Sequence, residues 1–201
     1  ENSKRVTVAE TTLANAQHRG SGGNGYLFEI RQSNEILTRD CTGRSGRHNF
    51  IQNWGFGATG CVWLRVRSED GIAIHGGADG PATRGSSEFH HSLATSNLVD
   101  DSHFDDGWSA INRGGFSSGS GHAATQNVLW NIRGQGLVAT YQYQHGYLVG
   151  TGPEIEVLYE LPDIGGLGTE PEDWVEGLSN GAGLEPRSLY QDQLRRRLGQ
   201  P

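Results

Sequence analysis

The chain is dominated by short runs in which apolar and polar residues alternate, separated by turn-forming residues. The runs extend from about residue 25 to residue 160 and are Tyr26–Ile30, Glu35–Thr38, Asn49–Ile51, Val62–Val66, Ile72–Ile74, Ser92–Val99, Ser109–Ile111, Val128–Ile132, Leu137–Thr140 and Tyr147–Val149. A period of two between Gly, Asn, Asp or Ser residues is typical of β-strands. No amphipathic helical pattern interrupts these runs, which argues against a βαβ fold. The 31 glycines among 201 residues fit the turns of such a strand-rich chain.

Two pairs of segments resemble each other at a separation of about 60 residues. IQNWGFG at 51–57 resembles INRGGFS at 111–117, and VWLRV at 62–66 has the same parity of apolar positions as VLWNI at 128–132. Chance is the alternative for matches this short. A true repeat of this kind predicts a solenoid with coils of about 20 to 30 residues.

Asparagines recur at or beside the ends of the predicted strands. They are Asn34, Asn49, Asn53, Asn97, Asn112, Asn127 and Asn131. A short amide side chain tolerates a left-handed backbone and can bond to the turn of the next coil. Stacked amides would satisfy polar groups that are otherwise buried without partners. Ordinary loop positions are the alternative, but they do not explain the spacing.

Four segments resemble the coils of right-handed parallel β-helix proteins of the pectate-lyase-like superfamily, a group of carbohydrate-active proteins. They are SNEILTRDCTG, GRHNFIQNWGFGATGCVWLRV, NLVDDSHFDDGWSAINRGG and GHAATQNVLWNIRG. The resemblance covers roughly residues 25 to 160 and implies a right-handed parallel β-helix with a polysaccharide as its partner. The superfamily includes lyases, hydrolases, epimerases, phage spikes and inert scaffolds, so the resemblance specifies architecture more than activity.

We expect three regions, namely an N-terminal arm at 1–24, the β-helix at 25–160 and a C-terminal tail of loop and helix at 161–201. The tail pattern predicts a short helix at Glu172–Leu178. A second helix opens at Pro186, where Ser188 and Gln191 fit a capping box and Leu189, Leu194 and Leu198 form an apolar stripe. This helix is expected to pack on the β-helix, sealing its end, or on a neighbouring subunit.

Composition restricts the partners and the compartment. The net charge is −7 and no basic stripe occurs outside Arg195–Arg197, which argues against nucleic acid. No apolar run approaches the roughly 20 residues of a membrane-spanning helix, so no membrane insertion is expected. The absence of methionine implies that residues were removed upstream or that the chain was excised from a longer protein. A signal peptide would be one such piece, so we expect a secreted or extracellular protein.

The two cysteines, Cys41 and Cys61, permit either one disulfide or two buried thiols, and the sequence leaves this open. Lys4 is the only lysine, which argues against a lysine base inside the fold. His90 and His91 are adjacent and would point to opposite faces of a strand, and no metal-binding spacing such as HExxH occurs. No cofactor or metal is therefore predicted, with Ca²⁺ as an alternative discussed next.

The span DDSHFDDGWSAINRGGFSSGSGH at 100–122 concentrates the candidate catalytic residues. Elimination on an acidic polysaccharide needs a base near the sugar C5 proton and a cation for the uronate, and here arginine, histidine or tyrosine must supply both. We therefore expect His103, Arg113, His122 and Tyr143 to converge on one face. In a strand, Asp100 and Asp106 share one face and Asp101 and Asp105 share the other. Two such carboxylates facing one groove are an alternative, as an acid–base pair for glycoside hydrolysis or as Ca²⁺ ligands. Solvated turn aspartates are the third interpretation.

Aromatic and cationic side chains near this span are the candidate substrate-binding residues. Trp108, Tyr141 and Tyr143 are expected at the surface, where aromatic faces stack on sugar rings, with Arg133 and His145 close by in sequence. Trp130 shares parity with Val128 and Ile132 and is expected inside.

The sequence thus predicts a protein that binds or acts on polysaccharide, as a lyase or glycoside hydrolase if it is an enzyme. The alternative is a non-catalytic structural or binding module, or a fragment, that assembles end to end with other chains. The physical reason for this alternative is that a short solenoid leaves unpaired strand edges at its ends.

Overall fold

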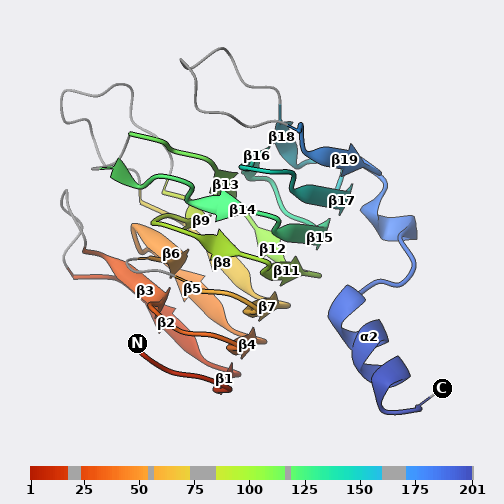
Figure 1. Ribbon diagram of the computed structural model, residues 1–201, viewed down its shortest axis with the longest axis horizontal. Coiled ribbons are helices and arrows are strands. Elements are labelled where there is room, and N and C mark those ends of the chain that lie inside the picture. The colour runs from red at the N-terminus through yellow and green to blue at the C-terminus, as the bar shows by residue number, and fades with distance from the viewer. Residues whose placement is uncertain (18–23, 54–56, 73–84, 116–118, 160–170, 201) are drawn as a thin grey trace.

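The computed structural model describes residues 1–17, 24–53, 57–72, 85–115, 119–159 and 171–200, and they form a parallel β-helix (Figure 1). Three stacked sheets make up its walls. Sheet I contains, in order, β1 (Thr7–Ala9), β4 (Leu37–Arg39), β7 (Val62–Leu64), β11 (Leu98–Asp100), β15 (Val128–Ile132), β17 (Tyr147–Thr151) and β19 (Trp174–Glu176). Sheet II contains β2 (Thr12–Ala14), β5 (Thr42–Arg44), β8 (Arg67–Glu69) and β12 (His103–Phe104).

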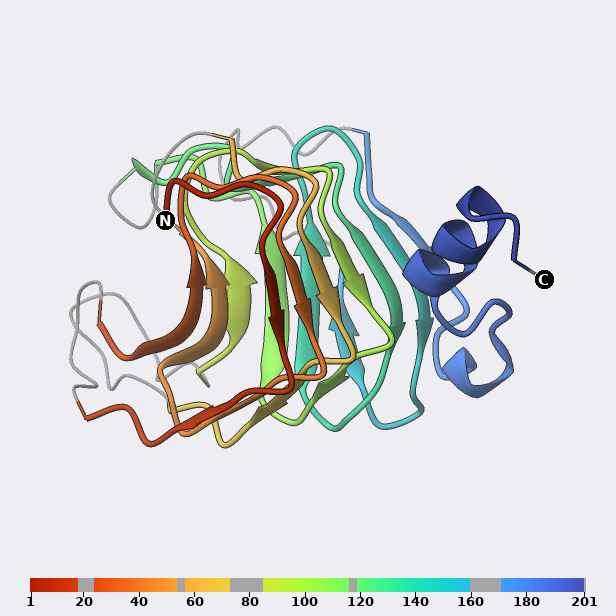
Figure 2. The same cartoon turned by 90° about the horizontal axis from the view of Figure 1, so that it is seen from below.

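Sheet III contains β3 (Tyr26–Ile30), β6 (His48–Gln52), β9 (Ser87–Phe89), β13 (Gly107–Ile111), β16 (Leu137–Tyr141) and β18 (Glu156–Leu158). A short fourth sheet pairs β10 (Ala94–Thr95) with β14 (Ala124–Thr125). Neighbouring strands of every sheet run parallel and belong to successive coils, so the chain advances along the axis one coil at a time (Figures 1 and 2). The predicted fold class is confirmed.

The strand register tests the internal repeat. Val62 pairs with Leu98 and Leu98 pairs with Val128, so VWLRV and VLWNI are equivalent strands two coils apart, as predicted. The match between IQNWGFG and INRGGFS is out of register by two residues. Gln52 and Ala110 both pair with Phe89, so they are equivalent positions. Ile111 is therefore level with Asn53 and not with Ile51.

The solenoid begins earlier and ends later than expected. β1 and β2 lie in the expected N-terminal arm, yet they pair with β4 and β5. β19 occupies the segment expected to be a short helix and continues sheet I beyond β17. Each of these strands is only three residues long, so its sequence shows a single alternation. The predicted strand Ile72–Ile74 lies partly outside the described residues.

The interior of the coils is lined by large side chains from all three sheets. Trp63, Phe50, Phe89, Phe104 and Trp108 are each 0% exposed. The Phe89 and Trp108 rings meet edge to face with centroids 5.1 Å apart. Full burial of such a side chain stabilises the fold by about 1.5 to 3 kcal/mol. The expectation that Trp108 lies at the surface is wrong, because β13 turns it inward beside Phe89.

Trp130 shows the opposite error. Leu129 is 0% exposed and faces the interior, so its neighbour Trp130 faces outward and donates from Nε1 to the carbonyl of Pro186 at 2.9 Å. The parity argument failed because Asn131 has a left-handed backbone, with φ of 53°. This turn brings Ile132 to the same interior side as Leu129.

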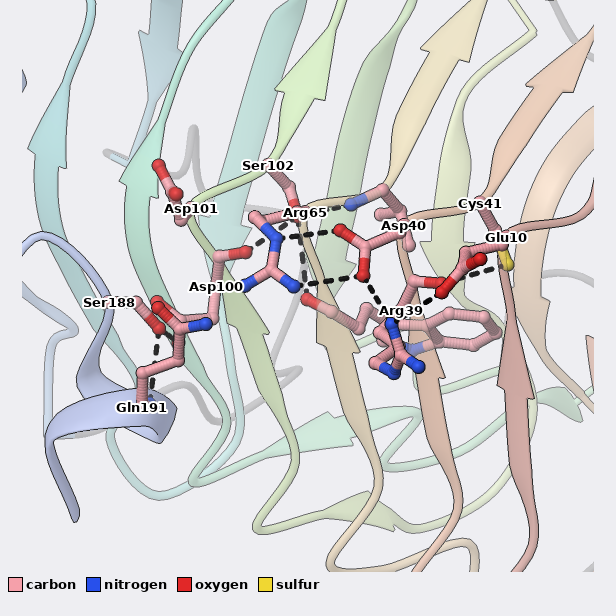
Figure 3. A network of polar contacts seen from close by, with 12 residues as sticks. Glu10, Arg39, Asp40, Cys41, Arg65, Asp100, Asp101, Ser102, Ser188 and Gln191 are labelled. Atoms are coloured by element: carbon pink, nitrogen blue, oxygen red, sulfur yellow. Dashed lines mark hydrogen bonds and ion pairs between the residues drawn. The ribbon is translucent and has the colours of Figure 1, made fainter. Parts of the chain in front are cut away.

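Sheets I and II are joined by a two-residue corner whose first residue is left-handed in successive coils. These first residues are Glu10, Asp40, Arg65 and Asp101, and the positions level with Asp101 in the later coils, namely Asn131, Gly150 and Gly177, are also left-handed. Asn131 is the only member of the predicted asparagine set with a left-handed backbone, so that expectation is wrong for the other six. Charged side chains take the corner instead and pair along the axis (Figure 3). Arg65 donates from Nε and Nη2 to the Asp40 carboxylate at 2.6 and 2.9 Å.

The predicted stacking of amides is confirmed for Asn97 and Asn127, which lie inside the solenoid before β11 and β15. Asn97 Oδ1 accepts from the Cys61 N–H at 2.9 Å, and Asn127 Oδ1 accepts from the Asn97 N–H at 3.0 Å. In the next coil Gln142 Oε1 accepts from the Asn127 N–H at 2.9 Å. Gly146 occupies the equivalent backbone position there, and a Cβ on it would collide with the Gln142 amide.

The C-terminal segment carries a 3₁₀ turn, η1 (Gly181–Gly183), and one helix, α2 (Leu189–Arg197). The predicted cap is confirmed, because Ser188 Oγ accepts from the Gln191 N–H at 3.2 Å. The expected packing of the leucine stripe is not found. No residue of α2 is buried, Leu198 is 56% exposed, and the helix projects from the side of the solenoid (Figures 1 and 2).

Two further sequence questions are answered by the fold. Cys41 and Cys61 are free, buried thiols, so the disulfide alternative is wrong. Burial raises the pKa of both thiols. In the part of the chain that the structure describes, no helix combines the length and the apolar character needed to cross a membrane.

Candidate functional site

The four aspartates of the 100–106 span point to different places and share no groove. Asp106 is 5% exposed and faces the interior, where Oδ2 accepts from Asn49 Nδ2 at 2.9 Å and from Ser68 Oγ at 2.8 Å. Asp105 faces outward on sheet II, with Oδ1 2.8 Å from His103 Nε2. Asp106 is therefore separated from Asp105, and neither faces a groove with Asp100 or Asp101, whose partners are described next.

The other two aspartates hold the C-terminal segment (Figure 3). Asp100 is 0% exposed, and its Oδ2 accepts from Ser188 Oγ at 2.6 Å and from the Tyr190 N–H at 2.8 Å. Asp101 accepts from Arg133 Nη2 at 2.6 Å and from Arg187 Nε at 3.2 Å. Among the described residues, no three His, Cys, Asp or Glu side chains gather to hold a metal ion, so the Ca²⁺ alternative has no ligand set there.

Two of the predicted substrate-binding residues lie beside sheet I. Arg133 is engaged by Asp101, as described above. His145 Nδ1 lies 2.5 Å from the carbonyl of Glu172, and its ring meets Tyr147 edge to face at 4.9 Å. Arg133 forms a parallel β-bridge with His103, whereas both lie away from the residues at the end of sheet III.

Four predicted residues do come together, at the end of sheet III. The rings of His122 and Tyr143 are stacked at 3.7 Å, and His122 Nδ1 lies 3.3 Å from Asn112 Oδ1, next to Arg113. Burial raises the pKa of Tyr141, while the nearby charge of Arg113 lowers it. The structure therefore brings Arg113, His122 and Tyr143 close together, whereas His103 lies apart from them on sheet II.

Arg113 leads to a cluster that the sequence did not predict, centred on Glu88 in β9. Ser87 and Phe89 are 0% exposed and face the interior, so strand alternation sends Glu88 to the outer face of sheet III. Glu88 Oε1 lies 3.0 Å from His48 Nε2 and 2.6 Å from His90 Nδ1. Its Oε2 forms an ion pair with Arg113 Nη2. We call Glu88, His48, His90 and Arg113 the Glu88 cluster.

The electrostatics of the cluster keep Glu88 ionised, although it is 2% exposed. Burial raises the pKa of Glu88, but His48, Arg113 and His90 outweigh burial, and the net pKa lies well below its usual value. Arg113 is the permanent cation among these partners. Burial lowers the pKa of His48, although the nearby Glu88 carboxylate raises it. Burial also lowers the pKa of His91, which follows His90 in the sequence, to about 4.

Hydrogen-bond partners orient the two imidazoles. His48 Nδ1 lies 2.5 Å from the carbonyl of Ser86, and the Tyr26 ring lies 5.3 Å from the His48 ring. Glu88 Oε1 lies 2.6 Å from His90 Nδ1. A carboxylate at this nitrogen favours the Nδ1–H tautomer, in which Nε2 is the basic nitrogen. The cluster therefore places a histidine and an arginine on the same carboxylate.

Sequence reasoning missed Glu88, His48 and His90 for an identifiable reason. Glu88 lies between two inward-facing residues, Ser87 and Phe89, so the sequence shows an ordinary alternating strand at this point. Only the register of the coils shows that Glu88 lies against His48 of the preceding coil. One signal was present, because Ser-Glu-Phe-His-His places a charge and two imidazoles within five residues.

No protein-family model, curated protein or solved structure matches the chain. The assignment of the site therefore depends on its geometry.

Proposed function

We propose that this protein acts on an acidic polysaccharide at the outer face of sheet III, as a β-helix protein similar to the pectate-lyase-like superfamily. The observation that carries the proposal is the Glu88 cluster, in which a buried carboxylate holds two imidazoles and an arginine on the outside of a sheet. Such an arrangement is costly to bury and is not required by the fold. The adjoining Tyr26, Tyr141 and His122–Tyr143 rings offer faces for sugar stacking.

The roles follow from the chemistry of β-elimination. His90 Nε2 takes the C5 proton of a uronate residue, and the electron pair of the broken C–H bond forms the C4=C5 double bond. The C4–O glycosidic bond breaks, its electron pair leaves with the glycosidic oxygen, and that oxygen takes a proton from water. Arg113 neutralises the uronate carboxylate. A guanidinium has five N–H donors, so an ion pair with Glu88 is compatible with binding a second carboxylate. Glu88 is a positioning residue for both. Export to the cell exterior, where such polymers occur, is part of the proposal.

The test is incubation of the protein with polygalacturonate, alginate and a glucuronate polymer, following the ultraviolet absorbance of the new double bond. We expect His90→Ala and Arg113→Lys to lower the rate at least about a hundredfold, the usual contribution of a positioned general base. Arg44→Ala, at an exposed position on sheet II, is the matched control and should keep the wild-type rate. Loss of activity in His103→Ala but not in His90→Ala would move the site to sheet II.

Binding without cleavage is the weaker form of the same proposal. If no double bond and no new reducing ends form, retention of the protein in a gel containing polygalacturonate should still depend on Arg113. Equal mobility with and without every acidic polymer would exclude this function for the sheet III face.

A second candidate function is end-to-end assembly with another copy of the chain, favoured by the open N-terminal end of the solenoid. There, β1, β2 and β3 are edge strands, and a cavity of about 130 Å³ opens among Val6, Val8, Phe28 and Ile36. Unpaired parallel edges next to an apolar cavity favour addition of a further coil. Light scattering over a range of concentrations should show growing species if copies stack, and a constant mass would contradict this.

A further inference from the structure

The outer face of sheet I carries a continuous apolar stripe. Leu37, Val62, Leu98 and Val128 are in register on successive strands and are all partly exposed, and Tyr147 and Trp174 continue the same column. With strands about 4.8 Å apart, these six side chains span roughly 24 Å. The exposed face of a sheet is normally polar, so a contiguous apolar column points to a contact surface.

The column ends in two exposed aromatic rings, which we call the Tyr147–Trp174 platform. Tyr147 is 40% exposed and Trp174 is 54% exposed, and they are directly paired across β17 and β19. The partner positions Leu148 and Val175 face the core, which fixes both rings outward. His145 supports the platform, because its ring meets Tyr147 edge to face and its Nδ1 lies 2.5 Å from the Glu172 carbonyl.

The charges around the platform are negative. Glu172 and Glu176, on either side of Trp174 in the sequence, are both exposed. Asp173 is turned into the solenoid, where it accepts from Thr140 Oγ1 at 2.6 Å and from the Gly146 N–H at 2.7 Å. Two exposed carboxylates beside the rings repel an anionic polymer, whereas their oxygens accept hydrogen bonds from sugar hydroxyls.

We propose that the Tyr147–Trp174 platform binds a neutral polysaccharide chain, whose sugar rings stack on the two aromatic faces. A pyranose ring has an apolar C–H face and a hydroxyl rim, which matches aromatic faces bordered by His145, Glu172 and Glu176. The platform lies on sheet I and the Glu88 cluster lies on sheet III, so this site goes beyond the proposed function. Each proposal can fail without the other.

The test is native affinity electrophoresis in gels containing hydroxyethylcellulose, glucomannan or galactan, with polygalacturonate as the acidic comparison. We expect a neutral polymer to retard the wild type, and Trp174→Ala to weaken the retardation at least about tenfold, as expected for loss of a stacking contact. Trp174→Phe should retain most of it. Tyr159→Ala is the matched control, because Tyr159 is 41% exposed on a different strand end. Arg113→Lys should leave neutral binding unchanged.

A second measurement reports on the platform directly. A bound polymer should protect Trp174 from acrylamide quenching, and the Trp174→Phe variant supplies the signal of the other tryptophans. The proposal is overturned if no neutral polymer retards the wild type, or if Tyr159→Ala weakens binding as much as Trp174→Ala. It is also overturned if Trp174→Ala only converts a dimer into a monomer, which would make the stripe a self-association surface. The Trp174 variants should melt at the same temperature as the wild type, since the Trp174 side chain is exposed.

Discussion

At the scale of single residues, the protein places charged and amide groups inside a narrow solenoid and satisfies them across coils. The Asn97–Asn127–Gln142 ladder supplies an acceptor to a backbone N–H of the neighbouring coil at each step. Leaving one such buried donor without a partner would cost about 1 to 3 kcal/mol. The ladder therefore fixes the register of the coils as well as stabilising them.

Asp106 is the interior residue with the clearest pH signature. Burial raises the pKa of Asp106 to about 6, against the opposing hydrogen bond from Ser68. Because the folded-state pKa is raised, the folded protein binds this proton more tightly than the unfolded chain. The contribution to stability is present below about pH 4 and is lost as the pH rises through about 6.

We predict that Asp106→Asn removes this loss. Relative to the wild type, the variant should gain up to about 3 kcal/mol of unfolding free energy between pH 4 and pH 7.5, from a shift of about two pKa units. Urea denaturation at several pH values measures the unfolding free energy of both proteins. The titration of the other groups cancels when the wild-type value is subtracted from the variant's value at each pH. A constant difference between wild type and Asp106→Asn would contradict the assignment.

At the scale of elements, the C-terminal segment is attached to sheet I by polar contacts rather than by a core. Asp100 accepts from Ser188 and from the Tyr190 N–H, so a β11 residue caps the N-terminus of α2. Trp130 Nε1 and Asn131 Nδ2 donate to the carbonyls of Pro186 and Arg187 at 2.9 and 3.0 Å. Since no residue of α2 is buried, the docking of the helix depends on these bonds and on the ion pair of Arg187 with Asp101.

Asp100→Ala should therefore detach the segment while leaving the β-helix folded. We expect the amides of residues 186–198 to lose their protection from hydrogen exchange, because the helix loses the carboxylate that accepts from the Tyr190 N–H, an interaction of the capping type that is typically worth about 1 kcal/mol. Hydrogen exchange with mass spectrometry provides the measurement. Asp192→Ala, which removes only the surface ion pair with Arg196, should leave the docking intact. Equal protection in wild type and Asp100→Ala would show that other contacts hold the segment.

The sequence predicted elements well where a strand carried two alternations and poorly where it carried one. Strands such as Tyr26–Ile30 and Val128–Ile132 were predicted with correct bounds, and the Ser188 cap was identified from its side-chain spacing. β1, β2 and β19 were missed because three residues define no period. For the site, Arg113, His122 and Tyr143 were named from chemistry. Glu88 and His48 required the register, which arises from coil lengths that local patterns do not encode.

At the scale of the whole molecule, each coil contacts its neighbours and little else, as in other solenoids. The two ends differ from the middle for this reason. β1 pairs only with β4, and Val6 and Leu13 near it are 41% and 38% exposed. The central coils bury Trp63, Val99 and Leu129 completely. Unfolding of the terminal coil exposes less new apolar surface than unfolding of a central one.

Hydrogen exchange should follow this gradient. We predict that amides of β1 and β2 exchange faster than those of β7 and β11, because opening the end breaks one interface between coils instead of two. The measurement is repeated at low and high protein concentration. Protection of β1 that rises with concentration supports end-to-end assembly, and protection that is uniform along the chain contradicts the gradient.

The two-residue corner between sheets I and II has a practical consequence. The corner has two residues in each of four coils, namely Glu10–Thr11, Asp40–Cys41, Arg65–Val66 and Asp101–Ser102. The length of a whole coil varies, because 36 residues separate the paired residues Val62 and Leu98 and only 19 separate Val128 and Tyr147. All variation in coil length is absorbed elsewhere in the coil. A foreign peptide grafted between sheets III and I should be displayed without changing the helical pitch, whereas one extra amino acid at the corner would turn the side chains of the following sheet II strand to the opposite face.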